Sequence, residues 1–215
     1  MRLITLTDPR SPVSEAYRTL RTNLSFYSLD EPLRTLVVTS PAPHEGKSTA
    51  AANLAVTMAQ SGKRTVLIDC DLRRPAIHTL FDISAEPGLT NVVLGETEHL
   101  PLCESGVENL WLLPSGAVPP NPADLLGSRH MDRVIVDLTA AYDMVIFDAP
   151  PVIAVTDAAI LGGKVDGVLL VIASGDTRRE HAERAKALLE KANVRIVGAT
   201  LTNAPQDDDV GGYYG

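Results

Sequence analysis

The chain has 215 residues, of which 45% are hydrophobic and 21% are charged, and its formal net charge at pH 7 is −8. This length can bury one hydrophobic core, so we expect a single globular domain. The acidic balance argues against nucleic acid as a partner, because proteins that bind nucleic acid usually present a basic face. No segment approaches the roughly 18 apolar residues of a membrane span, and the first residues lack a signal-peptide pattern. Cys70 and Cys103 have no metal-ligand spacing, so we expect a protein of the reducing cytoplasm.

The predicted elements begin with a helical pattern over residues 14–27, whose start is signalled by Ser11 and Pro12. Short apolar, β-branched runs predict strands at residues 35–39, 65–69, 110–113, 144–148, 167–172 and 195–200. Helical patterns lie between them at residues 47–60, 89–94, 131–141, 157–161 and 178–192. Strands that alternate with helices predict an α/β fold with a mostly parallel, doubly wound sheet and helices on both faces.

Two stretches lie outside this alternation. Residues 114–122 are rich in Pro and Gly, and we interpret them as an internal loop because the strand–helix pattern resumes after them. Residues 1–204 are therefore predicted to form one domain, in which residues 1–30 are an N-terminal helical segment. Residues 205–215 are polar, carry three aspartates at positions 207–209, and are expected to form a flexible tail.

A phosphate-loop pattern follows the first predicted strand. Residues 40–49 read Ser-Pro-Ala-Pro-His-Glu-Gly-Lys-Ser-Thr and run directly into a predicted helix, whose N-terminus attracts anions. The expected nucleotide-binding residues are Glu45, Gly46, Lys47, Ser48 and Thr49. Lys47 is expected at the β- and γ-phosphates and the Ser48 hydroxyl at Mg²⁺. The alternative is a chance Gly-Lys-Ser sequence at the start of a helix.

Carboxylates stand at the ends of two further predicted strands. Asp69 and Asp71 come at the end of the strand 65–69, and Asp148 ends the strand 144–148. Ligands of open parallel sheets bind at these strand ends, and Mg²⁺ takes one or two carboxylates completed by water and phosphate. A single aspartate could equally cap the following helix. Three of them beside a phosphate loop predict a nucleotide–metal site, with Ser48, Asp71 and Asp148 as metal ligands.

Together these residues resemble the bacterial protein-tyrosine kinases of capsule and exopolysaccharide synthesis, over nearly the whole chain. Asp69 with Asp71 look like the second Walker-type motif of that family, and Asp148 looks like its Walker B aspartate. The resemblance implies a protein-tyrosine kinase of the P-loop NTPase type that uses ATP and Mg²⁺. Lys47 would neutralise the phosphoryl group, and Asp69 or Asp71 would act as the base for the tyrosine hydroxyl.

The resemblance also implies acceptors and partners. Family members modify tyrosines in a flexible C-terminal cluster of a neighbouring subunit, and Tyr213 and Tyr214 match in place. Glu15, Arg18 and Arg21 match a Glu-x-x-Arg-x-x-Arg signature of subunit contact, which implies a ring-like homo-oligomer. Glu15 and Arg18 could instead form a local helix pair worth about 0.2–0.5 kcal/mol. A transmembrane activator of polysaccharide export is the other implied partner, and it would place the chain at the inner face of the cell membrane.

Two features depart from the family pattern. Pro41 replaces the first glycine of the common phosphate loop, and His44 stands where this family usually has glycine. A positive φ at His44 would cost about 1–2 kcal/mol and weaken nucleotide binding, unless His44 contacts phosphate itself. A surface histidine without a role fits equally well. The tail holds only two tyrosines, and Tyr17 and Tyr27 are alternative acceptors, although packing on a helix face explains them more simply.

Two other functions fit the same residues. An ATPase switch of the septum-site and plasmid-partition type shares the fold and the strand-end aspartates, but those proteins carry a lysine where this chain has Ala42. A nucleotide-binding regulator without turnover is compatible with His44 and with the short tail. Asn203, after the last predicted strand, is expected to contact adenine, or else to be an ordinary turn residue.

Overall fold

The computed structural model describes residues 3–27 and 32–205 of the chain. The strands are Thr35–Thr39 (β1), Thr65–Asp69 (β2), Cys103–Glu104 (β3), Leu110–Leu113 (β4), Met144–Asp148 (β5), Gly167–Ala173 (β6) and Ile196–Thr202 (β7). The helices are Ile4–Thr7 (α1), Pro12–Phe26 (α2), Lys47–Gln60 (α3), Ile77–Phe81 (α4), Leu89–Val93 (α5), Pro122–Gly127 (α6), Arg129–Ala141 (α7), Asp157–Gly162 (α8) and Arg179–Lys191 (α9). The expected acceptors Tyr213 and Tyr214 lie outside the described residues.

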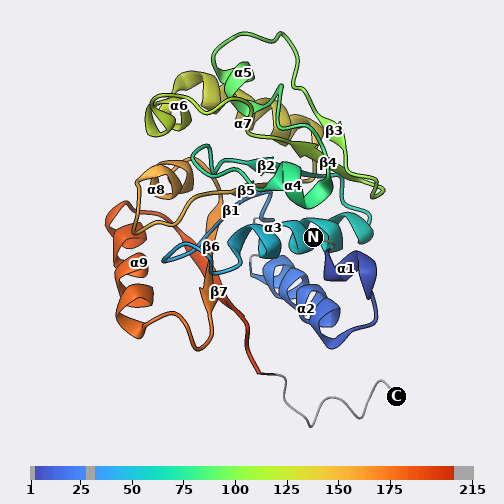
Figure 1. Cartoon of the computed structure of the whole chain (residues 1–215), viewed down its shortest axis with the longest axis vertical. Coiled ribbons are helices and arrows are strands. Elements are labelled where there is room, and N and C mark those ends of the chain that lie inside the picture. Colours follow the sequence, from blue (N-terminus) through green and yellow to red (C-terminus); the bar gives the residue numbers. More distant parts are fainter. Residues whose placement is uncertain (1–2, 28–31, 206–215) are drawn as a thin grey trace.

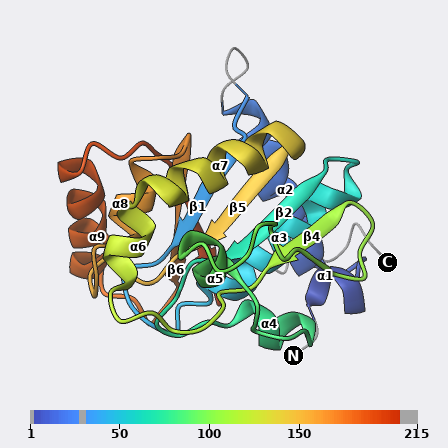
Figure 2. The same ribbon diagram turned by 90° about the horizontal axis from the view of Figure 1, so that it is seen from above.

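The strands join in one sheet, in the order β3-β4-β2-β5-β1-β6-β7. Neighbouring strands are parallel except β3 and β4, which are antiparallel. From β1 the chain first builds β2, β3 and β4 on one side, and then returns through β5 to add β6 and β7 on the other. Helices lie on both faces of this sheet (Figures 1 and 2). The prediction of a mostly parallel, doubly wound α/β fold is confirmed.

The core forms one layer on each face of the sheet. All five residues of β1 are buried, and their side chains alternate between the two faces because successive Cβ atoms of a strand point in opposite directions. Val37 packs with the residues of α5 to α9, whereas Leu36 and Val38 pack with those of α2, α3 and α4. Figure 2 shows α7 across the near face of the sheet and α3 behind it. Because both faces are covered, the central residues of the inner strands β1, β2, β5 and β6 are apolar and form short apolar runs in the sequence.

Buried polar contacts fix the N-terminal helices to α3. Asn53 of α3 is fully buried, and its Oδ1 accepts hydrogen bonds from the Thr5 backbone N–H at 3.1 Å and from the Thr5 hydroxyl at 2.8 Å. Its Nδ2 donates to the Thr49 carbonyl at 2.8 Å, in the first turn of α3. Farther along α3, the Thr57 carbonyl accepts a hydrogen bond from the Arg21 guanidinium of α2 at 3.1 Å. The N-terminal segment is therefore attached to the helix that follows the phosphate loop.

Several element boundaries differ from the predictions. α2 begins at Pro12 instead of residue 14, because the Ser11 side chain caps it by accepting a hydrogen bond from the Ser14 N–H at 3.2 Å. α6 begins at Pro122, where the predicted internal loop ends. The sequence pattern predicts α5 and α8 but none of the equally short α1, α4, α6 and β3, because elements of two to six residues seldom show a reliable period.

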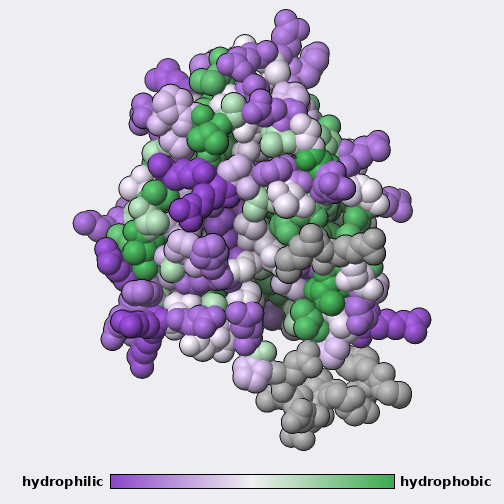
Figure 3. Space-filling view, viewed as in Figure 1, coloured by the Kyte–Doolittle hydropathy of each residue, from purple (hydrophilic) through white to green (hydrophobic). Residues whose placement is uncertain are grey.

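The molecular surface carries no continuous apolar belt on the face shown in Figure 3, where apolar side chains form separate patches between polar ones. The most exposed large apolar side chains, Phe26, Val118 and Val136, belong to three different segments of the chain. Within residues 3–27 and 32–205, no helix combines the length and the apolar character needed to cross a bilayer.

Candidate functional site

The phosphate loop connects β1 to α3, and its last residue, Gly46, is the N-cap of α3. Gly46 has a φ of 82°, a left-handed conformation that residues with a side chain rarely adopt. A Cβ atom at this position would also lie 3.3 Å from Cγ2 of Thr202 on β7. Glycine thus allows the loop to turn sharply into the helix while it packs against β7, and this places Lys47 and Ser48 in the first turn of α3.

The Glu45 side chain holds the loop in place. It is 5% exposed, and its carboxylate accepts hydrogen bonds from the backbone N–H groups of Ala42 at 2.9 Å and Ala173 at 3.4 Å. The Thr202 hydroxyl donates to the Glu45 carbonyl at 2.8 Å. These contacts tie the loop to β6 and β7. The Glu45 side chain therefore supports the loop and is not part of the cavity wall that its neighbours form.

His44 has a φ of 66°, a positive value that strains the backbone of a residue with a side chain. The phosphate loop therefore carries the strain expected at this position. We expect His44→Val to lower the free energy of unfolding by about 1–2 kcal/mol, because a β-branched residue tolerates this conformation less well than histidine. His44→Gly should change it by less than about 1 kcal/mol, because the entropy cost of glycine offsets the relief. Calorimetry of both variants without nucleotide measures the difference. Equal stability of the two variants would contradict the strain.

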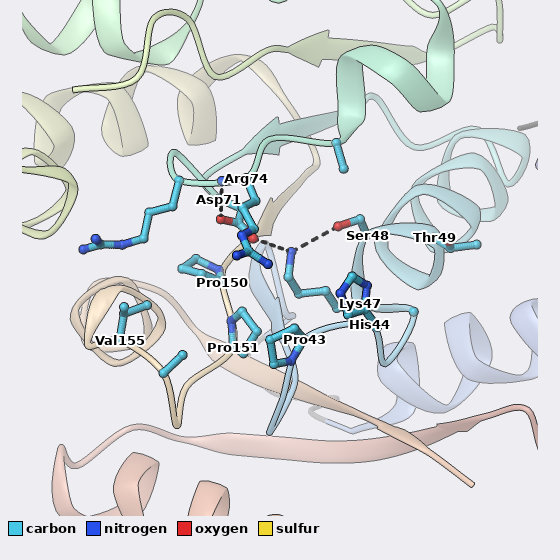
Figure 4. Close-up of a pocket in the computed structure, with 14 residues that line it drawn as sticks. Pro43, His44, Lys47, Ser48, Thr49, Asp71, Arg74, Pro150, Pro151 and Val155 are labelled. Carbon is cyan, nitrogen blue, oxygen red and sulfur yellow. Dashed lines mark hydrogen bonds and ion pairs between the residues drawn. The ribbon is translucent and has the colours of Figure 1, made fainter. Parts of the chain in front are cut away.

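Lys47 reaches from α3 to aspartates at two strand ends. Its Nζ lies 2.9 Å from Oδ2 of Asp71, 3.2 Å from Oδ1 of Asp148 and 3.1 Å from the Ser48 hydroxyl oxygen. Figure 4 shows the lysine side chain extending toward Asp71 from the side of the cavity that carries Ser48. Burial lowers the pKa of Lys47, but Asp148 and Asp71 outweigh burial and hold this pKa above its ordinary value. The lysine is therefore charged, and it neutralises two carboxylates at once.

Asp148 ends β5, which lies between β1 and β2, and its side chain is fully buried. Burial raises the pKa of Asp148, and Lys47 acts in the opposite direction. Its second oxygen, Oδ2, is buried and has no hydrogen-bond partner within the described part of the chain. Because an unpartnered buried carboxylate oxygen is costly, this atom marks a place where a further donor or a cation fits.

Asp69 and Asp71 have different surroundings. Oδ1 of Asp69 accepts a hydrogen bond from the Asp71 N–H at 3.2 Å, and Oδ2 accepts from the N–H groups of Ala76 and Ile77, each at 2.9 Å. Burial, and to a smaller extent Asp148, raise the pKa of Asp69 to about 7. Asp71 lines the cavity and Asp69 does not. Asp71 is thus the aspartate in position to meet a ligand, and Asp69 supports the loop that carries it.

A cavity of about 480 Å³ opens beside this cluster (Figure 4), and Asp148, like Asp69, lies behind its wall. The phosphate loop with the start of α3, the loop after β2 and the segment after β5 form its walls. The expected site residues that line it are Gly46, Lys47, Ser48, Thr49 and Asp71. Further lining residues, which the sequence motifs do not indicate, include Arg73, Arg74, Pro150, Pro151 and Val155.

Two arginines follow Asp71 in the wall formed by the loop after β2. Arg73 donates through Nε to Oδ2 of Asp157 at 3.0 Å, and Asp157, the first residue of α8, is buried. The backbone N–H of Arg74 donates to Oδ1 of Asp71 at 3.1 Å. The adjacent arginines are visible in the sequence two and three residues after Asp71. Their partners are not, because Asp157 lies 84 residues away from Arg73.

The remaining expected site residues lie away from the cavity. Asn203 is exposed, follows β7 and has a φ of 55°, which fits a turn residue, so its contact with adenine stays a prediction. Arg18 donates to Oε2 of Glu15 at 2.7 Å, with both side chains partly exposed, so the local pair forms. Tyr17 packs against the core beside them. The role of Glu15, Arg18 and Arg21 in subunit contact also stays a prediction.

A metal ion at this site would need ligands from outside the protein. In the described ranges, no group of three or more His, Cys, Asp or Glu side chains is arranged to hold a metal ion. The side chains of Ser48, Asp71 and Asp148 gather around Nζ of Lys47 and offer a hydroxyl and two carboxylates. This donor set fits Mg²⁺, which binds few protein carboxylates and completes its shell with water and phosphate.

Comparisons with known proteins agree with this geometry. The AAA domain family matches residues 44–178 of the chain. The tyrosine-protein kinase YwqD of Bacillus subtilis is 46% identical over 215 residues, which make up 99% of this chain and 91% of that protein. The chain belongs to the bacterial tyrosine-protein kinases. The solved kinase domain of the Escherichia coli tyrosine kinase ETK matches with a TM-score of 0.92 and 33% identity, over 97% of this chain and 82% of that one.

This bacterial tyrosine-protein kinase is a nucleotide-binding enzyme that transfers phosphoryl groups to protein tyrosine, as the family resemblance predicts. It spans only 27% of the length of the Escherichia coli protein Etk. The cell division ATPase MinD of Pyrococcus furiosus has the same fold, with a TM-score of 0.69 and 24% identity over 81% of this chain and 74% of that one. That lower similarity concerns the fold alone, and the kinase interpretation is preferred over the ATPase switch.

Proposed function

We propose that this kinase uses ATP and Mg²⁺ to phosphorylate Tyr213 and Tyr214 in the tail of a neighbouring copy of the same chain, and thereby regulates exopolysaccharide or capsule synthesis or export. The observation that carries the proposal is the gathering of one lysine, one hydroxyl and two carboxylates beside the phosphate loop. The unpartnered Oδ2 of Asp148 supports a cation in this cluster. The link to polysaccharide export rests on the family resemblance.

Each residue of the cluster has a role in this proposal. Ser48 and Asp148 would hold Mg²⁺ directly and Asp71 through a bound water, and the ion when bound neutralises charge on the phosphate oxygens. Lys47 exchanges its carboxylate partners for the β- and γ-phosphates. The tyrosine oxygen forms a bond to the γ-phosphorus while the bond to the bridging β–γ oxygen breaks, and ADP leaves with that electron pair. The Asp71 carboxylate takes the phenolic proton. A base is needed because a tyrosine hydroxyl with an unperturbed pKa of about 10 keeps its proton at neutral pH.

Mass spectrometry after incubation with Mg-ATP tests the proposal. We expect phosphate on Tyr213, Tyr214 or both, and none after Tyr213→Phe and Tyr214→Phe are combined. The Tyr17→Phe and Tyr27→Phe variants serve as controls and should keep full incorporation. Phosphate only on tyrosines outside the tail would contradict the proposed acceptors. Release of free phosphate without any protein phosphorylation would contradict the proposed reaction on this chain.

We further propose that the chain assembles through α2 into a ring-like homo-oligomer and works with a transmembrane activator at the inner face of the cell membrane. The Glu15–Arg18 pair supports a subunit contact, because both side chains are partly exposed on α2, at 44% and 31%. Arg21 already donates to the Thr57 carbonyl of α3. It would therefore join the contact surface to the nucleotide-binding helix.

The combined Arg18→Ala and Arg21→Ala variant is expected to shift the protein from oligomer to monomer, because it removes two cations from the expected contact surface. Light scattering coupled to gel filtration measures the mass. Arg184→Ala is the matched control, because Arg184 is exposed on α9, away from α2, and its loss should leave the mass unchanged. An unchanged mass of the double variant would rule out this contact.

A further inference from the structure

The cations in the cavity wall differ in whether they already have carboxylate partners. Lys47 is paired with Asp71 and Asp148, and Arg73 is paired with Asp157. For Arg74, in contrast, no carboxylate of residues 3–27 and 32–205 lies within ion-pair distance of the guanidinium. Arg74 is exposed and lines the cavity. Its positive charge is therefore available to an anion that enters this opening.

Arg74 is also fixed next to the residue that we propose as the base. Its backbone N–H donates to Oδ1 of Asp71 at 3.1 Å, and Figure 4 shows its side chain beside Asp71 at the cavity. Lys47 approaches the same aspartate from the opposite wall, at 2.9 Å from Oδ2. An acceptor tyrosine at Asp71 would thus have the phosphate loop on one side and Arg74 on the other.

The tail of the chain carries the complementary charge. Three consecutive aspartates, Asp207 to Asp209, precede the tyrosines Tyr213 and Tyr214. Asp209 and Tyr213 are four residues apart, a separation that an extended chain spans in at most about 14 Å. With Tyr213 at Asp71, Asp209 therefore stays within about 14 Å and Asp207 within about 22 Å of the site. Arginine is suited to this contact because its planar guanidinium binds carboxylates in two parallel hydrogen bonds.

We propose that Arg74 binds the acidic segment Asp207–Asp209 and makes this kinase selective for tyrosines that follow acidic residues. This inference rests on the proposed function, because it takes the tail tyrosines as acceptors. It defines the substrate class as acidic, tyrosine-containing peptide segments. A competing role for Arg74, direct contact with the nucleotide phosphates, predicts a different outcome in the same experiment.

Fluorescence anisotropy with labelled peptides tests this selectivity on the chain of 215 residues, with Mg²⁺ and a non-hydrolysable ATP analogue. One peptide has the sequence of residues 205–215, and the other carries asparagine in place of the three aspartates. We expect the native peptide to bind about three to ten times more tightly, and added salt to reduce the difference. Arg74→Gln should abolish the difference. Arg184→Gln, a change of the same kind on α9, should preserve it.

Reversing the charge at position 74 and on the peptide provides a second test. The Arg74→Glu variant should bind the native peptide poorly and prefer a peptide with lysine in place of the three aspartates. Equal binding of the native and asparagine peptides to the unmodified protein would overturn the proposal. A loss of nucleotide affinity in Arg74→Gln as large as the loss of peptide affinity would assign Arg74 to phosphate instead. Because binding requires no transfer, absence of phosphate on Tyr213 and Tyr214 would refute the proposed function without deciding the peptide preference.

Discussion

The Lys47→Met variant is expected to lose phosphotransfer and to unfold more easily. Activity should fall by at least about 10²–10³-fold, because the only lysine of the phosphate loop supplies charge where charge develops in the transition state. Stability should fall as well, since Asp71 and Asp148 are 6% and 0% exposed and would lose their shared cation. Breaking a buried pair costs about 3–5 kcal/mol, or roughly 6–20 °C in Tm for a chain of this size.

The two effects can be separated by a second substitution. Combining Lys47→Met with Asp148→Asn removes the buried charge that has lost its partner, so the Tm should recover while activity stays lost. Calorimetry is done in the presence of a chelator, so that Mg²⁺ does not replace the lysine. If the single variant is as stable as the unmodified protein, the lysine–aspartate pairs contribute no stability to the empty site.

The Asp71→Asn variant should fold normally and transfer phosphate very slowly. General-base catalysis contributes about 10²–10⁴-fold, so kcat on a tyrosine peptide is expected to fall by this factor. Stability should change by only about 1 kcal/mol, because asparagine can still accept the hydrogen bond from the Arg74 N–H and Lys47 keeps Asp148 as partner. Steady-state kinetics and calorimetry measure the two quantities. Retention of full kcat would exclude Asp71 as the base.

The Asp69→Asn variant, which pairs with Asp71→Asn, should be less stable than the unmodified protein by an amount that depends on pH. Its amide leaves at least one of the backbone N–H donors of Asp71, Ala76 and Ile77 without an acceptor, at about 1–3 kcal/mol. The pKa of Asp69 is raised from 3.8 to about 7 in the folded chain. This raised pKa gives the fold a contribution to stability that is fully present below pH 4 and is lost as the pH rises through 7.

It follows that the cost of Asp69→Asn should be larger at pH 5 than at pH 8. Denaturant unfolding at both values, with Asp71→Asn alongside, provides the measurement. A cost that is the same at both pH values would show that Asp69 does not titrate in this range.

The sequence predicts the exact bounds of four strands, and it predicts the strands at the two edges of the sheet less well. The predicted bounds of β1, β2, β4 and β5 are those observed, because each strand has an apolar run at its centre and Thr or Asp marks the ends of three of them. β7 extends to Thr202, two residues past its predicted end, where Leu201 is 59% exposed. At the edge of the sheet, alternating exposure replaces the unbroken apolar run that defines the inner strands. Backbone pairing with β6 alone continues the strand there.

The sequence indicates most residues of the site, but it does not indicate all the contacts among their side chains. The meeting of Lys47 with Asp71 and Asp148 follows from topology, because the carboxyl ends of β1, β2 and β5 lie together. The separate surroundings of Asp69 and Asp71 depend on the path of the loop after β2, which no periodicity encodes. The pairing of Arg73 with Asp157 depends on where α8 packs, and neighbouring residues in the sequence carry no signal of it.

The buried side chain of Asn53 has a thermodynamic consequence. It bonds to α1 through Thr5 and to the first turn of α3 through the Thr49 carbonyl, so one side chain connects the N-terminal helices to the turn that contains Lys47. If subunits meet through those helices, assembly and nucleotide binding share one coupling free energy. Such coupling is reciprocal. If a subunit contact tightens nucleotide binding tenfold, bound nucleotide must tighten that contact tenfold as well. The coupling free energy is about 1.4 kcal/mol in both cases.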